Sequence, residues 1–238
     1  MVSLEEIRTA VGLLGNVIAL MLFMSPVPTF LAIYKKKSVE QYSPVPYIAT
    51  IVNCALWVVY GLPIVHPHSL LVVTINGAGF CIQLIYLFIF VIYSNKRMRL
   101  RVVSVVLAEM AFVAVLAVLV LNLTHSTKLR STIIGSICMV GNIFMYASPL
   151  SVMKLVITTK SVEYMPFTLS LATFANAVCW TIYGTITDFD PNIAAPNGLG
   201  ILFAVAQLII YAIFYKSTKK KLAEEKIGRK NTEMVAAV

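Results

Sequence analysis

The sequence contains few charged residues. Only 12% of its 238 residues are charged and ten are acidic, whereas a typical soluble domain has about 25% charged residues. Hydrophobic residues make up 59% of the chain, and its mean hydropathy is +0.87. This composition excludes an ordinary soluble domain and indicates an integral membrane protein.

Residues that build metal centres and nucleophile sites are scarce as well. The three histidines fall between the apolar stretches, and no spaced cluster of His, Cys or acidic residues offers a catalytic centre. The four cysteines lie inside apolar stretches, where free thiols act as small hydrophobic groups; they are Cys54, Cys81, Cys138 and Cys179. We therefore expect no enzyme activity, no bound metal and no cofactor.

Long apolar stretches dominate the chain. A helix that crosses a bilayer needs roughly 20 mostly apolar residues, because its backbone polar groups must be satisfied internally. Seven stretches meet this requirement: 7–33, 45–62, 70–93, 102–121, 131–157, 166–186 and 193–215. The predicted fold is an all-α membrane protein with seven transmembrane helices.

Lysine and arginine residues collect in alternate loops. One set of loops holds most of them and includes the basic tail, whereas the opposite set holds only Arg8, Lys128 and Arg130. Because positive charge gathers in cytoplasmic loops, we expect the N-terminus outside the cytosol and the C-terminus inside it. The net charge of +9 then indicates topology and not nucleic-acid binding. The tail is also suited to touch anionic lipid.

The tetrapeptide K-S-V-E occurs at residues 37–40 and again at 160–163, and it belongs to a longer repeat. Adding 123 to a position in the first half pairs many uncommon residues, and after the loop near Asp190 the offset becomes 121. The pairs are Gly12 with Gly135, Pro26 with Pro149, Asn53 with Asn176, Trp57 with Trp180, Tyr60 with Tyr183 and Asn76 with Asn197. The repeating unit is a set of three helices.

The two units have the same orientation in the membrane. Both K-S-V-E copies lie in positively charged loops separated by four crossings, so the unmatched fourth stretch acts as an inversion linker. We expect a 3+1+3 arrangement: a first repeat at 7–93, a linker helix at 102–122, a second repeat at 131–215 and a basic cytoplasmic tail at 216–238. Such paired repeats are typical of transporters whose substrate binds near the membrane midplane.

Several motifs in this order resemble the SWEET (MtN3/saliva) family of eukaryotic sugar transporters, and in particular its plant members. They are Ser25-Pro26, Ser148-Pro149, both K-S-V-E copies, the W-x-x-Y-G segments at 57–61 and 180–184, and the segments 76–79 and 196–200. This family is itself a standard example of parallel repeats. The resemblance implies a sugar uniporter that works by alternating access in the lipid bilayer, with a homo-oligomer as an open option.

Paired polar and aromatic residues are the candidates for the sugar site. Asn76 and Asn197 lie within apolar stretches, where an amide needs a hydrogen-bonding partner. Helix–helix hydrogen bonding is one explanation; binding of sugar hydroxyls is the one that the resemblance favours. Trp57 and Trp180 offer flat apolar surfaces for a sugar ring, although an interfacial aromatic belt is the alternative.

The size of the site is expected to depend on four further residues. Asn53 and Asn176 precede the tryptophans by one helical turn and share their helix faces. The resemblance implies that these two line the cavity with Leu22 and Met145. Bulky side chains there favour a hexose such as glucose over sucrose.

Gating residues are expected on both sides of the site. The resemblance implies that Pro26, Pro46, Pro149 and Pro166 act as hinges of the inner gate, although Pro46 and Pro166 also suit helix starts. Tyr60, Tyr183 and Asp190 are the candidates for an outer gate, with Tyr60 facing Asp190.

Other functions and settings remain open from the sequence. Glu109 lies inside the linker stretch, where we expect a hydrogen bond to a neighbouring helix or subunit and not proton coupling. A seven-helix receptor would share the predicted topology but does not need the repeat, and a transporter of another small solute is the second alternative. The plasma membrane is the expected location, with the vacuolar membrane as the alternative.

Overall fold

The computed structural model describes residues 2–40 and 42–236. Within these residues the secondary structure is entirely helical. The nine helices are α1 (Leu4–Met24), α2 (Val27–Lys36), α3 (Val45–Gly61), α4 (Leu70–Tyr93), α5 (Lys96–Leu123), α6 (Thr127–Met145), α7 (Ala147–Thr159), α8 (Phe167–Tyr183) and α9 (Pro191–Ala236). The predicted all-α fold is confirmed.

The helices form seven crossings. The first crossing consists of α1 and α2, which continue each other after a short break, and the fifth consists of α6 and α7 in the same way. Five segments are long and apolar enough to span a membrane: Leu4–Lys36, Leu70–Tyr93, Lys96–Leu123, Thr127–Thr159 and Pro191–Glu224. The other two crossings are the shorter apolar helices α3 and α8, which have 17 residues each.

Helices α5 and α9 extend furthest beyond the boundaries expected from the sequence. The basic residues at 96–101 form the first turns of α5 and not a loop, because the side chain of Asn95 caps this helix by accepting from the Met98 N–H at 2.9 Å. At the other end, α9 continues without a break through the basic tail to Ala236. Residues 237 and 238 of the expected tail lie outside the described residues.

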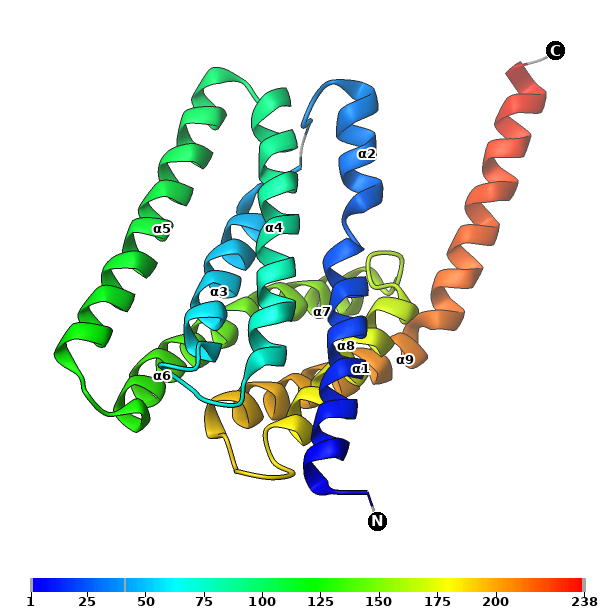
Figure 1. Cartoon of the computed structure of the whole chain (residues 1–238). Coiled ribbons are helices and arrows are strands. Elements are labelled where there is room, and N and C mark those ends of the chain that lie inside the picture. The colour runs from blue at the N-terminus through cyan, green and yellow to red at the C-terminus, as the bar shows by residue number, and fades with distance from the viewer. Residues whose placement is uncertain (1, 41, 237–238) are drawn as a thin grey trace.

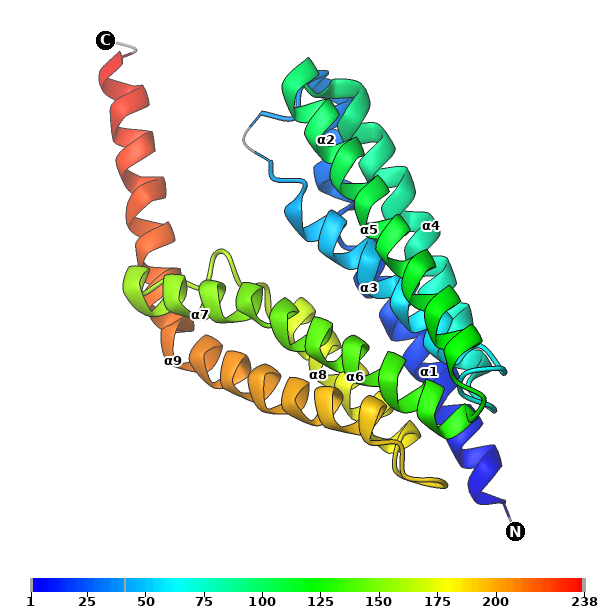
Figure 2. The ribbon, with the colours of Figure 1, turned by 90° about the vertical axis from the view of Figure 1, so that its left-hand side faces the viewer.

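Two halves of the molecule meet at one end and diverge at the other (Figure 2). Helices α1 to α4 pack together in the first half and α6 to α9 in the second, and α5 connects them along the outside of the first (Figure 1). The main contacts between the halves are α1 with α8 and α3 with α6. These two contacts are equivalent under the repeat, because α6 corresponds to α1 and α8 to α3.

The K-S-V-E segments end the first crossing of each half. Lys37 and Lys160 adopt left-handed conformations, with φ of 55° and 54°, immediately after α2 and α7. The serine that follows accepts a hydrogen bond from the glutamate N–H in both copies, at 3.2 Å and 3.4 Å. Val162 is buried in its half and Val39 packs against the core of the other. The repeated tetrapeptide is therefore a helix stop that anchors the following loop to the core.

The breaks in the first and fifth crossings follow from proline. Proline has no N–H, so Pro26 and Pro149 cannot bond to the carbonyl four residues earlier. The helix tightens before each proline instead: Ser25 N–H donates to Leu22 O one residue before Pro26, and Tyr146 N–H donates to Ile143 O three residues before Pro149, both at 3.1 Å. Pro26 and Pro149 are equivalent in the repeat, but the break in the second half falls two residues earlier in its register.

The other two prolines occupy helix starts. Pro46 lies in the first turn of α3 and Pro166 immediately precedes α8. They are 120 residues apart and are not in the register of the repeat. A helix start is a position that proline suits without any hinge function, so the proposed hinge role of these two stays a prediction.

Candidate sugar site and outer network

A polar cavity lies between the two halves. Its volume is about 140 Å³ and its walls come from α1, α3 and α4 on one side and α6, α8 and α9 on the other. The lining residues are Ala19, Phe23, Asn53, Trp57, Val72, Ile75, Asn76, Asn142, Asn176, Trp180, Ile193 and Asn197. Five amide side chains in an otherwise apolar region mark this cavity as a site for a polar ligand.

Asn76 on α4 and Asn197 on α9 line the same cavity and have the same local bonding. One N–H of Asn76 donates to Val72 O at 2.9 Å, and one N–H of Asn197 donates to Ile193 O at 2.8 Å. Among the described residues neither side chain forms a hydrogen bond to another helix. The structure therefore does not show the helix–helix hydrogen bonding that the sequence left open for these two amides. Each amide therefore keeps its oxygen and a second N–H for a ligand.

Asn53 and Asn176 each present an amide oxygen that lacks a protein partner among the described residues. Both oxygens are buried, and both side chains line the cavity. A buried acceptor without a partner costs roughly 1 to 3 kcal/mol. Hydroxyl groups of a sugar in the cavity would supply the missing donors.

The two tryptophans are buried and have different partners. The indole N–H of Trp57 donates to Asn142 Oδ1 at 3.3 Å, so a residue of the second half fixes a wall of the first. The indole nitrogen of Trp180 instead lies against Gly15, where an added Cβ would be 3.2 Å away. Burial inside the protein argues against the interfacial belt considered from the sequence.

Asn142 is a site residue that the sequence reasoning missed. Its counterpart in the first half is Ala19, so it does not appear among the identical pairs of the repeat. The feature of the sequence that could have indicated Asn142 is the presence of an amide within the apolar stretch 131–157. Leu22 and Met145 are half-buried on α1 and α6 but are not among the cavity-lining residues in the described part of the chain; their role stays a prediction.

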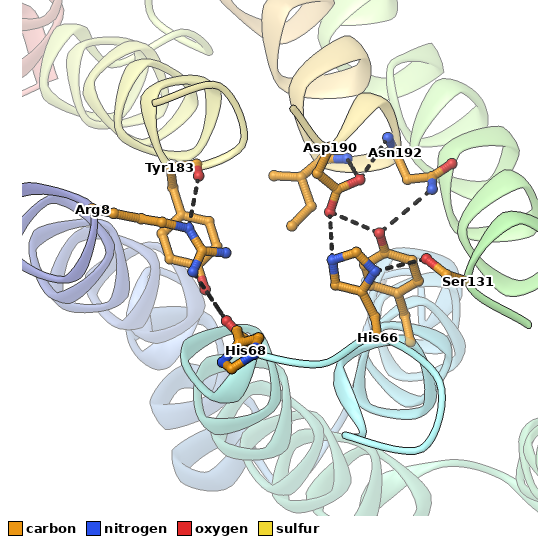
Figure 3. A network of polar contacts seen from close by, with 9 residues as sticks. Arg8, His66, His68, Ser131, Tyr183, Asp190 and Asn192 are labelled. Atoms are coloured by element: carbon orange, nitrogen blue, oxygen red, sulfur yellow. Dashed lines mark hydrogen bonds and ion pairs between the residues drawn. The ribbon is translucent and has the colours of Figure 1, made fainter. Parts of the chain in front are cut away.

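A network around Asp190 joins the two halves near the end that holds the N-terminus, and Figure 3 shows it from close by. The buried Tyr60 hydroxyl donates to Asp190 Oδ2 at 2.7 Å, and His66 Nε2 lies 3.3 Å from the same oxygen. The His66 ring also stacks on Tyr60 at 4.8 Å and contacts Ser131 Oγ at 2.7 Å. The other carboxylate oxygen accepts from Asn192 N–H at 3.0 Å and so satisfies the first turn of α9.

The charge state of His66 follows from its surroundings. Burial lowers the pKa of the ring; the nearby Asp190 carboxylate opposes this effect, while Arg8 and His68 reinforce it. Together these effects lower the pKa and favour the neutral ring. A neutral ring can donate from Nε2–H to Asp190 and accept at Nδ1 from the Ser131 hydroxyl.

A second network surrounds Tyr183, the counterpart of Tyr60 in the repeat (Figure 3). The Arg8 guanidinium lies 4.1 Å from the centre of the Tyr183 ring, and its Nε donates to Tyr183 O at 3.3 Å. Arg8 Nη1 and the Tyr183 hydroxyl both donate to His68 O, at 3.1 Å and 3.3 Å. Arg8 and Ser131 are 123 residues apart, so one position of the repeat contributes to both networks.

Glycine allows both tyrosines to approach the opposite half. A Cβ on Gly12 would lie 2.8 Å from the Tyr183 ring, and a Cβ on Gly135 would lie 2.8 Å from the Tyr60 ring. Each tyrosine also contacts the tryptophan one turn before it, with ring centres 5.2 Å apart in both halves. The cavity and the outer network are therefore in direct contact through paired aromatic residues.

Glu109 lies on α5, away from the cavity. Its Oε2 is buried and has no hydrogen-bond partner among the residues that the structure describes. It borders a separate apolar pocket between α5 and the start of α3. The expected hydrogen bond to a neighbouring helix is not present within this part of the chain, and a partner on another subunit stays a prediction.

Two parallel three-helix repeats around a central polar cavity, joined by one linker helix, define a membrane transporter. A family model described as "Sugar efflux transporter for intercellular exchange" matches residues 9–98 and 132–219. The chain belongs to this family, the SWEET (MtN3/saliva) transporters, which are not enzymes.

Individual relatives and a solved structure show the same relationship. Bidirectional sugar transporter SWEET4 of Oryza sativa subsp. japonica is 58% identical over 99% of this chain and 90% of its own. Bidirectional sugar transporter SWEET7 of Arabidopsis thaliana is 58% identical over 93% of this chain and 86% of its own. The structure of a eukaryotic SWEET transporter superposes with a TM-score of 0.85 at 38% identity, covering 88% of this chain and 97% of that one.

Proposed function

We propose that this protein carries sugars across the membrane by facilitated diffusion and in both directions. The observation that carries this proposal is the cavity between the halves, where two amides keep free bonding groups and two more have orphaned oxygens. Sugars are dense in hydroxyl groups that donate and accept, and they have apolar ring faces that suit tryptophan. The names of the close relatives support the same substrate class.

We propose alternating access as the mechanism. Contacts between the halves lie at the end that holds the N-terminus, where both tyrosine networks close the molecule, while the halves diverge at the end that holds the K-S-V-E loops (Figure 2). Rocking of one half against the other would open the tyrosine end and close the opposite end around a fixed site. The structure then represents the state that is open to the basic side.

Charge distribution supports the orientation. Most lysine and arginine residues lie at the diverging end, so we assign that end to the cytoplasm and the N-terminus to the outside. The plasma membrane stays the expected location. In this orientation the Tyr60–Asp190 contact belongs to the outer gate.

We further propose that a hexose is preferred to sucrose. The cavity has a volume of about 140 Å³, and Asn53 and Asn176 line it from α3 and α8. We expect a second sugar ring to compete with these two side chains for space.

Transport should not depend on a proton gradient. No pair of acidic or histidine side chains lines the cavity among the described residues, and Glu109 lies elsewhere. In yeast lacking hexose transporters, we expect uptake of radiolabelled glucose through this protein to be unchanged by a protonophore. If the cells accumulated glucose above its external concentration, and a protonophore abolished this accumulation, facilitated diffusion would be contradicted.

The outer gate should weaken when one hydroxyl is removed. Tyr60→Phe deletes the O–H that donates to Asp190 but keeps the ring contacts with Trp57 and His66. A hydrogen bond to a charged group contributes about 1.5 to 3 kcal/mol. The population of molecules with a closed outer gate should therefore fall at least about tenfold relative to those with an open outer gate.

Glucose uptake in the same yeast should therefore fall severalfold at equal surface expression. Tyr164→Phe is the matched control, because Tyr164 is exposed and has no part in either network. Wild-type uptake by Tyr60→Phe would show that the hydroxyl does not hold the gate.

A further inference from the structure

A second hollow, unrelated to the central cavity, runs along the outside of the first half. Its volume is about 350 Å³ and its lining is almost entirely apolar. We refer to it as the α2–α4 groove; its residues are Met24, Val27, Phe30, Leu31, Tyr34, Ile82, Ile85, Tyr86 and Ile89. Phe30 and Tyr86 form the floor, stacked with ring centres 4.3 Å apart.

The groove faces the bilayer and not the sugar pathway. Ile85 follows Asn76 by nine residues on α4, which is about 2.5 helical turns. Ile85 therefore lies on the face of α4 opposite to the cavity. Ile85 is 57% exposed, and Leu31 across the groove is 53% exposed. Hydrocarbon chains of the membrane therefore have direct access to both walls.

The length of the groove matches one leaflet. From Met24 to Tyr34 the wall advances ten residues, or about 15 Å, and the hydrocarbon core of a bilayer is about 30 Å thick. The groove begins near the break between α1 and α2 and ends at the last turn of α2. One acyl chain of the leaflet on the K-S-V-E side would lie along it.

A cation and two tyrosines stand at the end of the groove. Lys37 Nζ lies 3.8 Å from the centre of the Tyr34 ring, which is itself part of the groove, and donates to the Tyr93 hydroxyl at 3.2 Å. Among the described residues Lys37 has no carboxylate within ion-pair distance, whereas Lys36 pairs with Glu40 at 3.0 Å. The left-handed backbone at Lys37 ends α2 at this point, and its ammonium group lies beside Tyr34 and Tyr93 at the end of the groove.

We infer that the α2–α4 groove binds an anionic phospholipid of the cytoplasmic leaflet. One acyl chain packs between α2 and α4 over Phe30 and Tyr86. The headgroup phosphate accepts hydrogen bonds from Lys37 and from the hydroxyls of Tyr34 and Tyr93. The charge of Lys37 selects an anionic lipid over a zwitterionic one of the same chain length.

The repeat supplies a matched control within the chain. Lys160 occupies the position of Lys37 in the second half, with the same left-handed backbone, and its Nζ lies 4.9 Å from the Phe214 ring. Ile157 and Phe214 stand where the first half has Tyr34 and Tyr93, so this lysine lacks both hydroxyl groups. A lipid that only sought positive charge would not distinguish the two lysines.

Native mass spectrometry of the full chain tests the inference, with phosphatidylglycerol and phosphatidylcholine of identical acyl chains as probes. We expect one tight phosphatidylglycerol site. Lys37→Gln should weaken it by about fivefold, as expected for one basic residue near an anionic surface, and Lys160→Gln should leave it unchanged. Ile85→Trp should fill the groove and weaken the same site, whereas Val115→Trp, at an equally exposed position on α5, should not.

Three results would overturn the inference. One is the absence of a preference for phosphatidylglycerol in the unmodified chain. The second is an equal loss in Lys37→Gln and Lys160→Gln, which would indicate general attraction to positive charge. The third is a normal lipid site in Ile85→Trp; if an oligomer peak is lost in the same variant, the groove is an interface between copies of the chain.

Discussion

Replacing either Asn76 or Asn197 with alanine should abolish sugar uptake. Each substitution removes an amide oxygen and an N–H that no described protein group uses, so the sugar would leave hydroxyl groups buried without partners. Each such group costs roughly 1 to 3 kcal/mol, and loss at two hydroxyls would reduce uptake by about thirtyfold or more. The measurement is uptake of radiolabelled glucose in yeast lacking hexose transporters, at matched surface expression.

Asn16→Ala provides the control for these substitutions. Asn16 is a half-buried amide on α1 that bonds to Thr74 at 3.1 Å and is not among the lining residues of the cavity. The chemical change is the same, but the sugar site is untouched, so uptake should remain near the wild-type rate. Near-normal uptake by both Asn76→Ala and Asn197→Ala would remove these amides from the site.

Replacing both Asn53 and Asn176 with serine should shift transport from glucose toward sucrose. Serine is smaller but keeps a polar group, so the cavity widens on both sides and a second sugar ring gains room. A single group in a pocket changes discrimination by about 1 to 3 kcal/mol, which is at least fivefold in the ratio of sucrose to glucose uptake. Each single variant should shift the ratio only partway, because the two residues act from opposite walls.

The ratio itself is the readout for this pair, because it is independent of expression level. Asn16→Ser serves as the control outside the cavity and should leave the ratio unchanged. If the wild-type protein already carries sucrose as readily as glucose, or if the double variant keeps the wild-type ratio, these asparagines do not set substrate size.

The repeat made most of the fold predictable from the sequence. Seven apolar stretches and the offset of 123 residues predict the 3+1+3 arrangement, because a three-helix unit cannot recur in the same orientation without a linker crossing. The helical start of α5 was not predictable in this way. Basic residues at 96–101 read as a cytoplasmic loop, and only the cap from Asn95 shows that the helix begins there.

The site was predictable where the two halves are identical and not where they differ. The structure places six of the eight expected binding residues around one cavity, and their roles stay predictions. Asn142 was missed because its counterpart is Ala19. Arg8 was counted only as a charge that reports topology, and its contact with Tyr183 requires the docking of α1 on α8.

Counterflow in proteoliposomes tests the central claim most directly. The purified chain would be reconstituted into liposomes loaded with unlabelled glucose and diluted into a trace of labelled glucose. A uniporter with alternating access predicts a transient accumulation of label above its external concentration, absent in the Asn76→Ala variant. Entry of label no faster than into protein-free liposomes, or entry without this transient, would contradict the account.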